Sequence, residues 1–166
     1  SAATLIMMLL FTTAFAASPS FRTQTLTALV EMFDDHSEIR FSGTTNGAET
    51  HKMSILWMPD GYQIGLEEFD ESRMIIRADG ENGENLDVAA TAISKNRSYS
   101  FDTEGAIEES AMVQNNEAGV YQMKTEKGDK ITVLWTDMEK GWIVKVTGYN
   151  ISKEDMLRIS ESVEIR

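Results

Sequence analysis

The last third of the chain contains two segments in which apolar and polar residues alternate, and this pattern restricts the fold more than any other feature. The segment ITVLW (131–135) has Ile, Val and Trp at every second position, and WIVKVT (142–147) has Trp, Val and Val at the same spacing. Because successive side chains of a strand point to opposite faces, both segments are predicted to be half-buried antiparallel strands. Together with residues 120–124 they predict a three-strand meander with turns at 127–129 and 137–141.

The region between residue 39 and this meander consists of short extended runs separated by turn residues such as those of PDG (59–61). Because the turns are short, neighbouring runs should pair in an antiparallel manner. We therefore predict an α+β fold, with a mainly antiparallel curved sheet of about seven or eight strands and a helix at each end of the domain. The runs are Met53–Met58, Tyr62–Leu66, Arg73–Ala78, Leu86–Ile93 and Ser98–Glu104.

The N-terminal helix is predicted over residues 18–35. Ser18 supplies a capping hydroxyl, and Pro19 is suited to the first helical position. Apolar residues at Leu26, Leu29, Val30 and Phe33 follow with the spacing of one helix face.

The C-terminal helix has the clearest local signal in the chain. Ser152 is expected to cap the helix, Asp155 to reach back to the cap, and Ile151 to pack on Met156 as a hydrophobic staple. The inward face should then continue through Ile159, Ser160 and Val163.

Residues 2–21 carry no charged side chain, and residues 1–17 are interpreted as an apolar leader preceding a single α+β domain over 18–166. A membrane span needs about 20 apolar residues, which this segment just provides. Ala14-Phe15-Ala16 also resembles a signal-peptide cleavage site. A third interpretation is a helix packed in a groove of its own domain or of a neighbouring chain, which would give a homodimer through residues 2–17.

Composition excludes several functions. The net charge is −12 and the pI about 4.5, which argues against binding to nucleic acid or to an anionic lipid surface through the folded domain. The chain has no cysteine and only two histidines, so disulfides, thiolate chemistry and a metal site are not expected. No cofactor motif is present in the sequence, and none is predicted.

Candidate site residues are few. Trp57, Tyr62, Trp135 and Trp142 could line a ligand groove, although aromatic strand residues are more often part of a core. Asp102 and Glu104 have the spacing of an acid–base pair, but carboxylates at strand ends are commonly solvated. The acidic segment DGENGEN (79–85) lacks the EF-hand pattern and is interpreted as a hairpin loop.

The segment VLWTDMEKGWIVKVTGYNISKEDMLRISESVEIR (133–166) resembles the C-terminal signature of the bacterial domain-of-unknown-function family 4367. SFDTEGA (100–106) is similar to a mid-domain segment of that family, and WMPDGY (57–62) to its early hairpin. The matching positions at the C-terminal end are Trp135, Gly148, Ile151, Ser152, Glu154, Ile159, Glu161 and Ser162.

This resemblance implies a domain of Gram-positive bacteria that lies outside the cell membrane, attached to a single span, in some members with an anti-sigma-factor-like region. It implies no catalytic residues. We therefore expect a non-enzymatic extracytoplasmic sensing or binding domain of a membrane-anchored regulatory protein. The alternative is a secreted carrier-like module that binds a lipid or another apolar ligand on a curved sheet, and an envelope hydrolase is a third interpretation.

Overall fold

The computed structural model describes residues 29–32, 36–40, 51–94 and 98–166, which belong to two compact units. The described part of the first unit contains the strands β1 (Leu29–Met32) and β2 (His36–Arg40) and all but the last residue of β7 (Ser98–Asp102), in the sheet order β1-β2-β7. β1 and β2 are antiparallel, and Val30 lies opposite Ile39.

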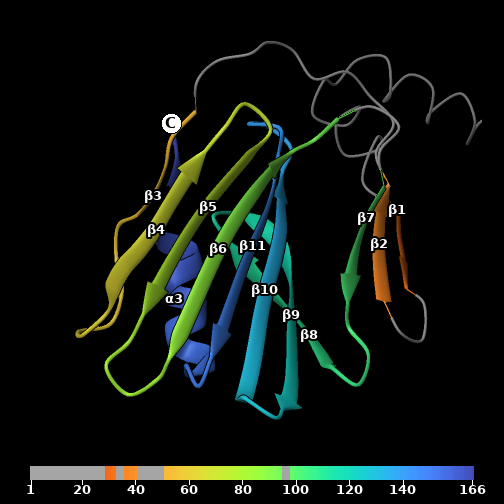
Figure 1. Cartoon of the computed structure of the whole chain (residues 1–166). Coiled ribbons are helices and arrows are strands. Elements are labelled where there is room, and N and C mark those ends of the chain that lie inside the picture. The colour runs from red at the N-terminus through yellow and green to blue at the C-terminus, as the bar shows by residue number, and fades with distance from the viewer. Residues whose placement is uncertain (1–28, 33–35, 41–50, 95–97) are drawn as a thin grey trace, which may run out of the picture. The chain divides into compact units, whose positions relative to one another are not determined.

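The second unit is built on a seven-stranded sheet with the order β4-β5-β6-β11-β10-β9-β8, in which every neighbouring pair is antiparallel. Only the β6–β11 pair joins strands that do not follow each other in sequence, and β11 is thereby placed at the centre (Figure 1). The strands are β4 (Gln63–Phe69), β5 (Arg73–Asp79), β6 (Asn85–Ala92), β8 (Ile107–Val113), β9 (Asn116–Thr125), β10 (Gly128–Asp137) and β11 (Trp142–Tyr149).

The hydrophobic core lies between this sheet and the helix α3 (Lys153–Ser162). Alternate side chains of the central strands point toward the helix, which contributes Met156 and Ile159, both fully buried. Each fully buried large apolar side chain stabilises the fold by about 1.5–3 kcal/mol, so this layer is the main stabilising feature of the unit. The sheet contributes Met74, Ile76, Leu86, Val88, Val120, Val133, Trp135, Trp142, Val144 and Val146.

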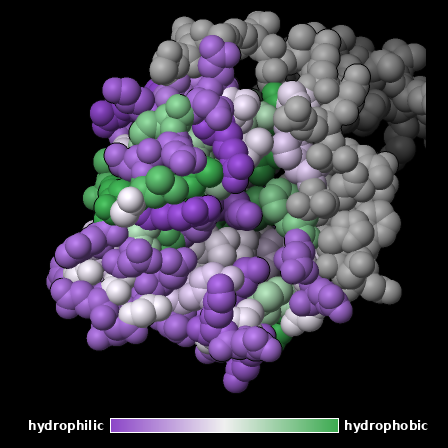
Figure 2. All heavy atoms as spheres, viewed as in Figure 1, coloured by the Kyte–Doolittle hydropathy of each residue, from purple (hydrophilic) through white to green (hydrophobic). Residues whose placement is uncertain are grey.

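The face of the sheet that points away from α3 is mixed in character. Ile75, Leu134 and Ile143 are buried there. Polar residues lie opposite two of them on the neighbouring strands: Lys145 is paired with Leu134, and Thr91 with Ile143. Figure 2 shows this side of the molecule, where hydrophilic surface surrounds smaller hydrophobic areas. The alternation on β10 and β11 therefore separates a continuous core face from a face with interspersed polar residues.

α3 begins with the expected cap and lies close to the sheet. The Ser152 hydroxyl accepts a hydrogen bond from the Asp155 N–H at 3.1 Å and donates one to the Asp155 carboxylate at 2.7 Å. The backbone of β11 has a glycine, Gly148, beneath the helix. A Cβ atom at that position would lie 2.4 Å from the Met156 sulfur and 2.8 Å from Ile151 Cδ1. The absence of a side chain at Gly148 thus permits the close approach of α3.

The C-terminal end of α3 is held by the turn between β8 and β9. Gln114 and Asn115 form this two-residue turn, both with positive φ (50° and 64°). The Gln114 amide donates to the carbonyl oxygens of Ser160 and Glu161 at 3.3 and 3.2 Å, and the Glu161 carboxylate accepts from the Gln114 N–H at 3.1 Å. These contacts satisfy carbonyl groups that a helix end leaves without intrahelical partners.

After α3 the chain returns as β12 (Val163–Ile165), which pairs antiparallel with β3 (Met53–Ile55). The pairing extends to the chain end, where Lys52 and Arg166 exchange backbone hydrogen bonds of 2.9 and 3.0 Å. This small sheet joins the beginning and the end of the second unit.

The structure confirms a mostly antiparallel sheet with a C-terminal helix, but it differs from the sequence prediction in two respects. The sheet is not strongly curled, as the ribbon shows (Figure 1). The N-terminal helix predicted over 18–35 is not shown: residues 29–32 are the strand β1, and the remainder lies outside the described residues. A short apolar run is compatible with the helical period of 3.6 residues and with the strand period of two. In this run, pairing with β2 determines that the backbone is extended.

We predict that Gly148→Val destabilises the protein by about 1–3 kcal/mol, because the new side chain would overlap Met156 and Ile151 and force α3 away from β11. Urea unfolding monitored by circular dichroism measures the change. Gly65→Ala on β4 is the matched control, since its Cβ would meet only an Asp79 oxygen at 3.9 Å. Equal stability of the two variants would contradict the packing argument.

Candidate functional site

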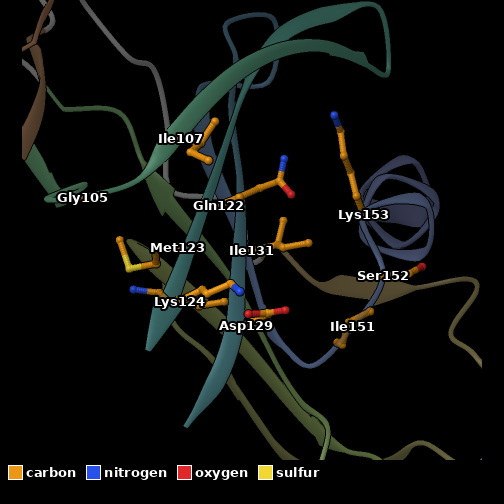
Figure 3. A pocket seen from close by; sticks show the side chains of 11 residues that line it. Gly105, Ile107, Gln122, Met123, Lys124, Asp129, Ile131, Ile151, Ser152 and Lys153 are labelled. Atoms are coloured by element: carbon orange, nitrogen blue, oxygen red, sulfur yellow. The ribbon is translucent and has the colours of Figure 1, made fainter. Parts of the chain in front are cut away.

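The candidate site is a cleft of about 600 Å³ between the sheet and the start of α3. Its sheet side is formed by β8, β9 and β10, and its other side by residues 151–153 at the beginning of the helix. Figure 3 shows the side chains of Gln122 and Ile131 projecting from the strands toward this helix end, whereas Met123 points away. The cleft lies wholly within the second unit.

The strand register explains why these residues meet. Gln122 of β9 is opposite both Ile107 of β8 and Ile131 of β10, so the three side chains stand in one row on the face that carries α3. Ile131 and Ile151 are buried, while Ile107 is 68% exposed at the outer rim. The floor of the cleft is therefore apolar and its outer wall is open to solvent.

An ion pair connects the helix to the outer wall. The Lys153 ammonium lies 2.5 Å from a Glu109 carboxylate oxygen, and the other Glu109 oxygen accepts a hydrogen bond from the Gln122 amide at 2.8 Å. The hydrogen bond from Lys153 lowers the pKa of Glu109, with a further contribution from the positive charge of Lys153. Both partners are substantially exposed, so the pair contributes little to stability and can be exchanged for a ligand contact.

The lining residues suit binding. The floor offers apolar contact, and Gln122, Lys124 and Lys153 offer an amide and two ammonium groups at the rim. Ser152 is occupied as the helix cap and donates to Asp155. The arrangement fits a ligand with an apolar part and a carboxylate or carbonyl group.

The structure does not bring the four aromatic candidates into one groove. Trp135 and Trp142 are core residues, 3% and 2% exposed. Trp57 and Tyr62 are half-buried on the opposite side of α3 from the cleft, with the Arg158 guanidinium 3.9 Å from the centre of the Trp57 ring. Burial, followed by the nearby charges of Glu84 and Asp155, raises the pKa of Tyr62. The ligand-binding role of these four residues stays a prediction.

The two core tryptophans, Trp135 and Trp142, have different surroundings. The indole N–H of Trp135 is buried and has no hydrogen-bond partner among the residues that the structure describes. The Trp142 ring is met edge-on by His51, with the ring centres 5.4 Å apart. His51 is thus placed as a packing residue beside the core.

The acidic candidates lie at a strand end and in turns, because Asp102 is the last residue of β7 and Glu104 is in the turn that follows it. Asp102 and Glu104 are both exposed, and the Glu104 N–H donates to the Asp102 carboxylate at 3.3 Å. Residues 80–84 form the hairpin loop between β5 and β6, where the Glu84 carboxylate accepts from the Asn82 N–H at 2.8 Å. Within the described ranges there is no cluster of three or more His, Cys, Asp or Glu residues suited to a metal ion.

The sequence did not indicate the cleft or the ion pair of Lys153 with Glu109 beside it. Ile107 and Glu109 lie on β8, a strand that was not predicted because two glutamates interrupt its apolar pattern. Gln122 and Lys153 are ordinary surface residue types, and only the strand register and the helix position bring them together. The cap at Ser152 was the one available signal, since it placed the helix start at this end of the sheet.

The fold and the site define a class: an antiparallel sheet backed by a capped C-terminal helix, with an open cleft at the start of that helix. The family described as "Domain of unknown function (DUF4367)" matches residues 52–163, which span β3 to the first residue of β12. The chain belongs to this family. No curated protein and no solved structure matched the chain in the corresponding comparisons.

We predict that Lys153→Met raises the pKa of Glu109 toward its ordinary value, because Lys153 is the largest cause of the lowering. A lowered pKa means that the ion pair is present at neutral pH and is lost as the pH falls through the folded-state pKa. NMR titration of the Glu109 side chain measures this shift. Lys127→Met, at an exposed turn position, is the control; an identical change in both variants would disprove the assignment.

Proposed function

We propose that this protein is the extracytoplasmic sensing or binding domain of a membrane-anchored bacterial regulatory protein. Family membership supports the bacterial assignment, and the cleft at the start of α3 supports binding. The proposed ligand contacts the apolar floor formed by Ile131 and Ile151 and replaces Glu109 as the partner of Lys153. The proposed role is recognition of a ligand.

The observation that carries the proposal is that the cleft lies at a joint between two structural elements. α3 is attached to β8 at its beginning through Lys153 and Glu109, and its end is attached to the β8–β9 turn through Gln114. A ligand that takes Lys153 removes the first attachment and leaves the second. Binding would therefore alter how α3 is held along β8, which is the local change that a sensing domain needs.

The open form of the cleft favours this proposal over a lipid carrier. A carrier that stores an acyl chain needs an enclosed apolar cavity. Here the lining combines isoleucines with lysine, aspartate and glutamine side chains, and Ile107 at the rim is largely exposed. This composition suits a small ligand that binds reversibly.

Attachment to the membrane is proposed to occur through residues 1–17, which have the composition of an apolar leader. Among the described residues there is no helix with the length and hydropathy needed to span a bilayer.

The location can be tested with a single cysteine, because the natural chain contains none. We predict that Glu126→Cys, at the exposed β9–β10 turn, reacts with a membrane-impermeant thiol reagent in intact cells. The wild-type chain supplies the background. Labelling that appears only after the membrane is permeabilised would place the domain on the inner side and refute the proposal.

The role of the cleft can be tested with Gln122→Trp, which would fill the space between β9 and α3. The transcripts that change when the gene is deleted provide the readout. We predict that the variant loses most of this regulation while remaining folded and present at the wild-type level. Gln63→Trp, at an exposed position of β4 away from the cleft, should regulate normally. Normal regulation by both variants would show that the cleft is not the sensing site.

A further inference from the structure

β8 is an outer strand of the seven-stranded sheet, and most of its length is accessible to solvent. It pairs with β9 on one side, and in the part of the chain that the structure describes no strand lies on its other side. Residues 107–110 and 112 are exposed. Two of them are large and apolar: Ile107 is 68% exposed and Met112 62%.

The turn between β8 and β9 determines which backbone groups of β8 point outward. Val113 and Asn116 are paired across the two-residue turn, so they exchange both ladder hydrogen bonds. Hydrogen-bonded positions alternate along an antiparallel strand. The N–H and C=O groups of Glu108, Ser110 and Met112 therefore point away from the sheet, and such an unpaired row is a template for another strand.

The other outer strand, β4, is a poorer template. Its register with β5 shifts between Ile64 and Leu66, which marks a bulge. A bulge twists an edge and breaks its row of outward groups, which is one way in which proteins protect sheet edges. β8 keeps an unbroken register with β9 over its whole length.

We propose that a second copy of this chain pairs with β8, related to the first by a two-fold axis at Ser110. The three outward positions are symmetric about Ser110, so in this register Glu108 faces Met112 of the second copy and Ser110 faces its own equivalent. Each of these pairs exchanges two backbone hydrogen bonds, about six in total. The interface is isologous, because the same strand segment serves both copies.

The charges of β8 are compatible with this register. No two carboxylates lie directly opposite each other, since Glu109 faces Ala111 of the second copy. The two Glu109 side chains are two residues apart along the strands, about 7 Å, and the Lys153 ammonium of each copy compensates the charge of its own Glu109. The two Glu108 side chains are four residues apart along the strands, about 14 Å at about 3.4 Å per residue. That separation exceeds the Debye length of about 8 Å at physiological ionic strength, so their repulsion is largely screened.

The register also covers the exposed apolar side chains of the edge. Met112 packs beside the aliphatic part of Glu108 of the second copy, and Ile107 lies opposite Val113 of the second copy. The axis is perpendicular to the sheet, so both α3 helices lie on the same face of the joined sheet and run antiparallel.

The test uses cysteine cross-linking of the full chain. Residues facing each other in a hydrogen-bonded antiparallel pair have Cα atoms about 5.5 Å apart, within the range of about 4.4–6.8 Å that a disulfide spans. Ser110→Cys should therefore form a disulfide-linked dimer of doubled mass under mild oxidation. Glu68→Cys, exposed on β4, should stay largely monomeric. Equal cross-linking of the two variants, or none in either, would overturn the proposal.

A second pair of variants tests the backbone pairing itself. Ser110→Pro removes an outward N–H without removing a bond to β9, and it should reduce the sedimenting mass from dimer to monomer. Ser110→Ala keeps the N–H and should remain dimeric. A wild-type chain that is monomeric, or a Ser110→Pro variant that stays dimeric through residues 2–17 or another surface, would refute pairing at β8.

Discussion

The packing of α3 on β11 at Gly148 is the constraint on which the rest of the second unit depends. Because a glycine lies beneath the helix, Met156 and Ile151 pack directly against the sheet backbone. The remaining helix faces are then directed to either side. On one side, Lys153 contacts β8 and Glu161 contacts the β8–β9 turn. On the other side, α3 contacts the segment after β3. There Arg158 lies over the Trp57 ring, and the Ser162 hydroxyl donates to the Trp57 carbonyl oxygen.

This geometry gives β8 two different surfaces. The side chains of Ile107, Glu109 and Ala111 lie on the face that carries α3, and Ile107 lines the cleft. The backbone of Glu108, Ser110 and Met112 forms the open edge. The two surfaces belong to the same few residues. A ligand in the cleft that displaces Glu109 from Lys153 would act on the strand that we propose as the contact between copies, so occupancy and association would be thermodynamically linked and reciprocal.

The sequence predicted the elements that have strong local signals. Alternation located β10 and β11, and the Ser152 cap located the start of α3, because in both cases neighbouring residues carry the information. β8 was missed since Glu108 and Glu109 interrupt its pattern, and β1 was assigned to a helix since a four-residue run fits either period. The cleft could not be predicted from any single segment. Gln122 and Lys153 meet only through strand register and helix packing, which are non-local.

The overall acidity of the chain sharpens the selectivity expected of the cleft. A net charge of −12 repels anions at long range, but at physiological ionic strength charges beyond about 8 Å are largely screened. Within that distance, a ligand in the cleft interacts with the ammonium groups of Lys124 and Lys153. It must compete with Glu109 for the ammonium group of Lys153. A highly charged anion gains little there, because Asp129 and Glu109 lie beside those ammonium groups. A ligand with one carboxylate or carbonyl group and an apolar body satisfies both the rim and the isoleucine floor, and that is the chemistry the site favours.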